Sequence, residues 1–174
     1  GIVAGQDSRL VDAVSERDFE RVTVLLDDGV DVKTPRGDGA TALIWAAHWD
    51  DLQTVDLLLR AGADPNASDD HGVTPLERAT ENASLDMVEL LLAGGADATA
   101  TRTSGLTPLM TAAKTGHVAI ARTLIDHGAD VNTVTTETGS TALMWALAAP
   151  HPEVVRLLLA HQANPNLATH VGFT

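Results

Sequence analysis

Gly72-Val73-Thr74-Pro75-Leu76 is the stretch that decides the fold, because its centre, Thr-Pro/Ala-Leu, occurs four times in the chain. The copies begin at Thr41, Thr74, Thr107 and Thr141, at spacings of 33, 33 and 34 residues. A fixed period near 33 indicates one supersecondary unit that is repeated and stacked on its neighbours. Within each copy, Thr can cap the start of a helix and Pro fits the first helical turn, so the stretch predicts a helix opening.

The rest of each unit predicts a second helix and its end. A Leu-rich run follows after a brief link, as at residues 57–59 and 90–92, and a Gly-Ala-Asp segment then begins at Gly62, Gly95 or Gly128. Glycine provides the left-handed conformation that ends many helices. In the last unit Gln162 stands in that place, where holding a non-glycine residue left-handed costs on the order of 1 kcal/mol.

The period divides the chain into one array of repeats. We expect a tail at residues 1–7, a degenerate capping repeat at 8–35, and repeats at 36–68, 69–101, 102–134 and 135–168. The first unit lacks the Thr-Pro-Leu opening and is rich in charge, which suits a unit that faces water on one side. Residues 169–174 match the start of a further repeat, which leads us to expect that the chain is part of a longer array.

These motifs resemble the ankyrin repeat over residues 8–174, with Gly62-Ala63-Asp64-Pro65-Asn66 as the clearest ending. The resemblance implies an all-α solenoid of helix–loop–helix units with β-hairpin-like fingers and a concave binding groove. The family's usual His after Thr-Pro-Leu is replaced at every copy, by Ile44, Glu77, Met110 and Met144. The wording of residues 141–146 is also similar to ankyrin arrays of bacterial proteins, which are often exported.

The same resemblance implies which side chains face a partner, namely those at the fingertips and on the exposed side of each first helix. In the second repeat these are Asp38, Ala40, His48 and Trp49, and in the third they are Asp70, His71, Val73, Glu81 and Asn82. The fourth repeat provides Ser104, Leu106, Lys114 and Thr115, and the fifth provides Glu137, Ser140, Ala148 and Ala149.

Tryptophan is enriched at the energetic centres of interfaces, which makes Trp49 the principal candidate. The alternative interpretation is that Trp49 packs over the loop before Leu52. Trp45 and Trp145 occupy equivalent positions three repeats apart, and we expect both to be partly buried between neighbouring helices.

Composition narrows the kinds of partner. The net charge is −13, and the 11 Lys and Arg residues are scattered, whereas nucleic-acid binding needs them clustered. The same charge disfavours anionic membrane surfaces. We therefore predict a protein partner, basic if the acidity serves recognition; the alternative is that the acidity serves solubility. The chain contains no cysteine, which excludes disulfides and thiolate chemistry.

No catalytic or phosphate-binding motif is present, so we predict a non-catalytic protein-binding module without cofactor or metal. Two other functions stay open: a regulatory or targeting module of a protein whose catalytic domain lies outside this chain, and a structural or oligomer-forming spacer. We expect a monomer; the alternative is that molecules associate through the uncapped C-terminal end of the array. The sequence has no signal or transmembrane segment and does not identify a compartment.

Overall fold

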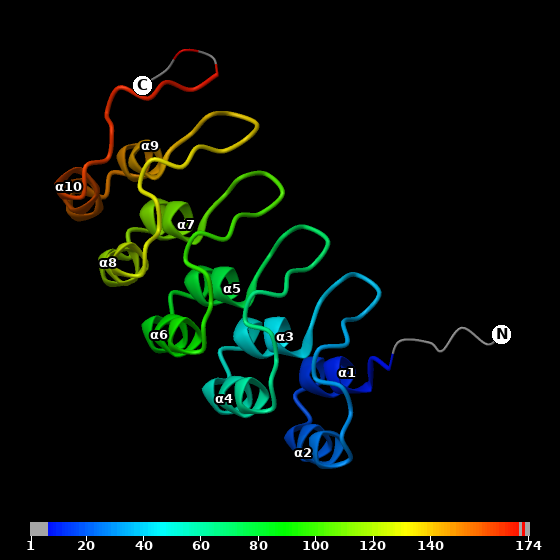
Figure 1. Ribbon diagram of the computed structural model, residues 1–174. Helices are drawn as coiled ribbons and strands as arrows, with labels where there is room; N and C mark the ends of the chain where they lie inside the picture. The colour runs from blue at the N-terminus through cyan, green and yellow to red at the C-terminus, as the bar shows by residue number, and fades with distance from the viewer. Residues whose placement is uncertain (1–6, 171, 173–174) are drawn as a thin grey trace.

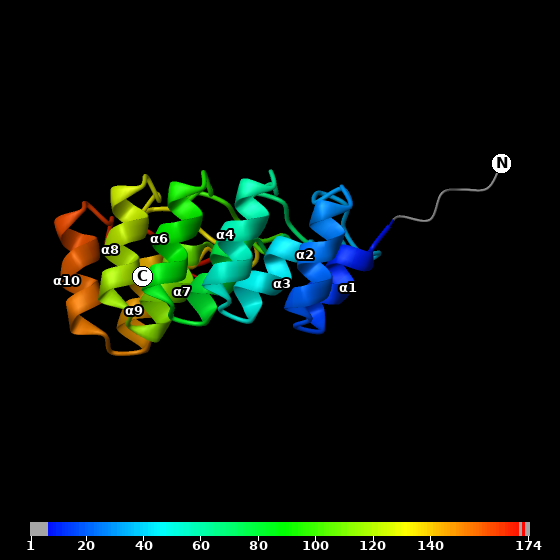
Figure 2. The ribbon, with the colours of Figure 1, turned by 90° about the horizontal axis from the view of Figure 1, so that it is seen from below.

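The computed structural model describes residues 7–170 and residue 172, and in this part of the chain it contains ten α-helices and no strand. The helices form two parallel rows, with the odd-numbered helices in one row and the even-numbered helices in the other (Figures 1 and 2). Loops project from the odd-numbered row on the side away from the even-numbered row (Figure 1). We call these loops fingers. The prediction of an all-helical array of repeats is confirmed.

Each of the five predicted repeats contains one helix pair. The first helices are α1 (Arg9–Ser15), α3 (Ala42–His48), α5 (Pro75–Glu81), α7 (Pro108–Thr115) and α9 (Ala142–Ala148). The second helices are α2 (Phe19–Asp27), α4 (Leu52–Arg60), α6 (Leu85–Ala93), α8 (Val118–Asp126) and α10 (Pro152–Ala160). Residues 1–6 of the predicted tail and residues 171, 173 and 174 of the predicted stub lie outside the described residues.

The first helices begin where the threonines predicted. In four of them, the hydroxyl oxygen of the capping threonine accepts a hydrogen bond from the backbone N–H three residues later, at 3.1–3.3 Å. The four caps are Thr41, Thr74, Thr107 and Thr141. This satisfies one of the N–H groups that a helix start leaves free. Ser8, at the start of α1, makes no such bond and instead donates to the Asp12 carboxylate at 3.1 Å.

The second helices also end as predicted. Gly62, Gly95 and Gly128 have φ angles of 91°, 94° and 93°, in the left-handed region. Gln162 adopts φ 66° at the equivalent place after α10, so the chain holds a glutamine where the other repeats hold glycine.

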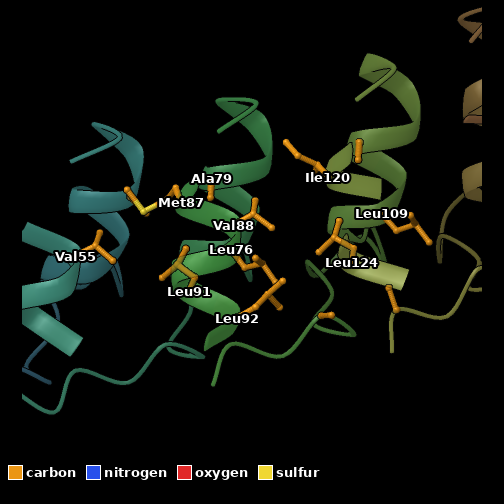
Figure 3. Packing of buried hydrophobic residues seen from close by; sticks show 14 of the residues in the cluster. Val55, Leu76, Ala79, Met87, Val88, Leu91, Leu92, Leu109, Ile120 and Leu124 are labelled. Atoms are coloured by element: carbon orange, nitrogen blue, oxygen red, sulfur yellow. The ribbon is translucent and has the colours of Figure 1, made fainter. Parts of the chain in front are cut away.

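Small side chains allow the helix rows to stack closely. Ala46, Ala79, Ala112 and Ala146 are all fully buried, one in each of the four later first helices. Between the two rows, Leu91 and Leu124 of α6 and α8 are also fully buried and pack with their neighbours from adjacent repeats (Figure 3). The core is therefore a continuous layer along the array, and each repeat depends on the next to cover it.

Adjacent fingers are joined by backbone hydrogen bonds. Asp70 N–H donates to the Asp38 carbonyl at 3.1 Å, and the same pairing joins Thr103 to His71 and Thr136 to Ser104. Glycine permits this close approach: a Cβ on Gly105 would lie 2.8 Å from the Thr136 nitrogen. The fingers therefore form one edge of the molecule, along the row of first helices.

Candidate partner-binding surface

The fingers and the exposed side of the first helices form the candidate surface, next to the odd-numbered row from which the fingers project (Figure 1). Exposed side chains among the predicted residues are Asp38, His48, Trp49, Asp70, His71, Glu81, Asn82, Lys114, Thr115, Glu137 and Ala148. Half-buried ones are Ser104, Leu106, Ser140 and Ala149.

Ala40 and Val73 add little side-chain area to this surface, because they are only 6% and 3% exposed. Each directly precedes a capping threonine, and its carbonyl accepts a hydrogen bond across the base of the finger, from Arg36 or Asp69 N–H. Such a position fixes the backbone and turns the small apolar side chain inward.

An aromatic cluster lies at the C-terminal end of α3. The ring centroids of Trp45 and His48 are 5.6 Å apart, those of His48 and Trp49 4.8 Å, and those of the two tryptophans 6.1 Å. The guanidinium of Arg17 lies 5.7 Å from the ring centroid of Trp49, and that of Arg36 lies 5.6 Å from the ring centroid of Trp45. We call Trp45, His48 and Trp49 the aromatic cluster.

Trp49 combines features of its two sequence interpretations. Its side chain is 39% exposed, so part of the ring is open to a partner. The rest lines a small cavity with Arg17 and Phe19 of the first repeat and Asp51 of its own. Trp49 therefore packs on the link between α1 and α2 as well as beside its own loop.

Trp45 and Trp145 are half-buried against the core, as the sequence predicted. In each, the indole Nε1 is buried and has no hydrogen-bond partner among the described residues. The ammonium of Lys114 lies 5.1 Å from the ring centroid of Trp145, and cations are attracted to aromatic faces at such distances.

A buried carboxylate that the sequence analysis did not select lies beneath the middle of the surface. Glu77 is 2% exposed, and its Oε1 accepts hydrogen bonds from Thr111 Oγ1 at 2.7 Å and Arg102 Nη2 at 3.0 Å. Glu81 accepts from Arg78 at 2.9 Å and also from Arg102. Burial raises the pKa of Glu77, and its bonds to Thr111 and Arg102 offset part of that rise.

Other polar side chains on the surface hold the repeats together. The Asn82 amide donates to the carbonyls of Ala47 and His48, at 3.0 and 2.9 Å, and so fixes the end of α3 to the next repeat. Arg36 is paired with Asp12 at 2.7 Å. The candidate surface is therefore supported from repeat to repeat by side chains that face it.

Among the described residues, no group of three or more His, Cys, Asp or Glu is placed to hold a metal ion. Within the same part of the chain, every helix is too short or too polar to span a lipid bilayer.

Stacked helix pairs with projecting fingers and an open lateral surface define a solenoid repeat protein. The sequence matches a family model described as ankyrin repeats (3 copies), once over residues 10–102 and once over residues 94–169. The chain therefore belongs to the ankyrin-repeat family. No curated protein matches it. Ankyrin repeats generally serve as protein–protein interaction modules and are typically non-catalytic.

Proposed function

We propose that this chain binds a protein partner without catalysis, through the groove and fingertips on the side of the first helices. The observation that carries the proposal is the aromatic cluster, in which His48 is exposed and Trp49 is 39% exposed. Large aromatic side chains that are held in place and still open to solvent are typical of residues that dominate binding energies.

The fold supports this function in two ways. The cluster rests on helices and on cross-repeat hydrogen bonds, such as those from Asn82, so little ordering is needed when a partner docks. The net charge of −13 favours a basic partner and raises its association rate at low salt.

Affinity capture with matched variants tests the proposal. The parent chain is compared with a surface variant, Trp49→Ala/Lys114→Glu/Thr115→Ala, and with a control variant on the even-numbered helices, Glu89→Ala/Arg122→Glu. All the substituted residues are exposed, and both variants are first shown to melt like the parent. Proteins captured from lysate of the organism that encodes the chain are identified by mass spectrometry.

The expected result is a protein retained by the parent and the control variant and lost with the surface variant. Direct titration of that purified protein then gives its dissociation constant and salt dependence. A protein lost only with the control variant would place binding on the even-numbered helices and overturn the proposal.

The regulatory or targeting alternative uses the same surface, in a protein whose catalytic domain lies outside this chain. It predicts that the captured partner is a substrate or location marker for a catalytic domain joined to this chain. Adding the chain in trans to such a domain should then compete for the partner and reduce the activity of the intact protein.

A specific observation favours the spacer alternative. Leu147 of α9 is 57% exposed, whereas the equivalent residues Ala47, Thr80 and Ala113 are fully buried by the following repeat. Leu147, Pro150 and Val155 line an apolar cavity of about 510 Å³ at this end. If the end joins molecules, light scattering of the chain should show concentration-dependent dimers that Leu147→Glu abolishes.

A further inference from the structure

A third cavity, of about 120 Å³, lies between the fingers that precede α3 and α5 and those two helices. Its lining includes Asp38, Ile44, Trp45, His48, Asp69 and Arg78. We propose that this pocket receives one arginine side chain of the protein partner. The inference rests on the proposed function, because it assigns a chemical anchor to that same surface.

Two carboxylates make the pocket attractive to a cation. Asp38 forms no ion pair with any described residue, and only its Oδ1 is engaged, by Ala40 N–H at 3.0 Å. Asp69 Oδ1 accepts from His71 and Val73 N–H at 2.9 Å, while Oδ2 lies 3.8 Å from Arg78 Nη2, longer than a hydrogen bond. Each carboxylate therefore keeps an oxygen available for an incoming donor.

The guanidinium of Arg78 also lines the pocket, and its charge is already matched. Its Nη1 donates to the Glu81 carboxylate at 2.9 Å, so Asp69 is not the only carboxylate that pairs with Arg78. Asp38 and Asp69 together therefore leave excess negative charge in the pocket.

The aromatic lining favours arginine over other cations. Arg36 and Arg17 already lie over Trp45 and Trp49, which shows that rings of this cluster accept guanidinium groups. A planar guanidinium can stack on an aromatic ring while its fork of N–H groups binds carboxylates, whereas the lysine ammonium acts as a point charge. Trp45 and His48 provide the rings, and Asp38 and Asp69 provide the acceptors.

Nuclear magnetic resonance titration of the ¹⁵N-labelled chain tests this assignment. The chain has three tryptophans, so its indole N–H signals are few and separable. The indole N–H of Trp45 is buried without a partner beside the pocket, and Trp145, three repeats away, is an internal reference. The probe is N-acetyl-arginine methylamide, and its citrulline analogue has the same shape without the charge.

We expect the arginine probe to shift the Trp45 signal with saturation, at a dissociation constant of about 1 mM for so small a ligand. The citrulline probe should not shift the Trp45 signal, and neither probe should shift the Trp145 signal. Asp38→Asn/Asp69→Asn keeps oxygen acceptors for the finger backbone and should weaken binding about tenfold or more. Asp70→Asn removes one carboxylate charge from the finger that carries Asp69, but outside the pocket lining. It should leave binding unchanged.

A Trp45 signal that does not respond to the arginine probe would overturn the assignment, as would equal responses to arginine and citrulline. A stronger response to N-acetyl-aspartate methylamide would assign the pocket to an anionic side chain instead. If the probe fails while the captured partner still depends on Trp49 and Lys114, only the pocket is wrong. If the probe binds and no partner depends on the surface, the proposed function is wrong.

Discussion

At the scale of the residue, left-handed backbone positions are where this array departs from its own pattern. Gln162 has φ 66° where the four other repeats have glycine. Arg17, Asp50 and Ala83 have φ 60°, 55° and 59° at the place where the fourth repeat has Gly116. Side chains with a Cβ are strained in this region. Glycine at such a position would therefore relieve backbone strain.

Replacing Gln162 by glycine should raise the free energy of unfolding by about 1 kcal/mol, reduced slightly by the greater freedom of glycine in the unfolded chain. Gln162→Ala, which keeps a Cβ at the same φ, is the matched control and should show no gain. Urea unfolding followed by circular dichroism measures both. Equal stability of the two variants would mean that the backbone at this position carries no strain.

Glu77 should make stability depend on pH. Its pKa in the folded protein is raised above the ordinary value of 4.5, so the unfolded chain releases this proton at lower pH than the folded one. As pH rises from 4.5 through the folded pKa, the group therefore lowers the free energy of unfolding, by about 1.4 kcal/mol for each unit that separates the two pKa values.

Glu77→Gln should remove this dependence, so the stability of the variant relative to the parent should increase with pH across that window and then level off. Urea unfolding at a series of pH values measures the difference. Glu89→Gln, which removes an exposed carboxylate from α6, controls for net charge. A constant difference between Glu77→Gln and the parent at every pH would show that burial does not affect the titration of Glu77.

At the scale of the element, each first helix depends on its threonine cap. Thr107 is 5% exposed, so its hydroxyl meets the Met110 N–H away from solvent, at 3.1 Å. Water cannot easily replace that bond if the hydroxyl is removed.

Thr107→Ala should therefore lower the free energy of unfolding by roughly 1–2 kcal/mol, while Thr107→Ser, which keeps the hydroxyl, should lose much less. Thermal melts of both variants test the difference. If Ser and Ala are equally destabilising, the loss comes from the threonine methyl group and not from the cap.

The elements were predictable where their signals are local. The caps and the glycines act within a few residues, and both lie where the sequence predicted. The burial of Glu77 was not predictable, because its partners Arg102 and Thr111 lie 25 and 34 residues away. The burial of Ala40 and Val73 was not predictable for a related reason: the base of each finger turns inward, and only the packed repeat shows that direction.

At the scale of the whole molecule, cover by neighbours determines local stability. Helices α3 to α8 belong to repeats that have a neighbour on each side, whereas α9 leaves Leu147 57% exposed. In stacked repeats, stability comes from the interfaces on both sides of each unit.

Backbone hydrogen exchange should consequently be slowest in α3 to α8 and faster in α1, α2, α9 and α10. Leu91→Ala, which opens a cavity at a fully buried site in α6, should cost about 2–5 kcal/mol and reduce protection mainly in the central repeats. Leu52→Ala, at a residue 38% exposed on α4, is the matched control. Uniform protection along the array would mean that it unfolds only as a whole.

The joining of the fingers gives the molecule two edges of different stiffness. One backbone hydrogen bond per step links neighbouring fingers, while fully buried alanines fit the helices tightly against each other. We therefore expect the array to bend mainly by changes in the spacing between neighbouring fingers, while the spacing between the packed helices stays nearly constant. A ligand bound across two fingers would then change the curvature of the neighbouring repeats, so that distant fingers would be coupled without any change in the helices.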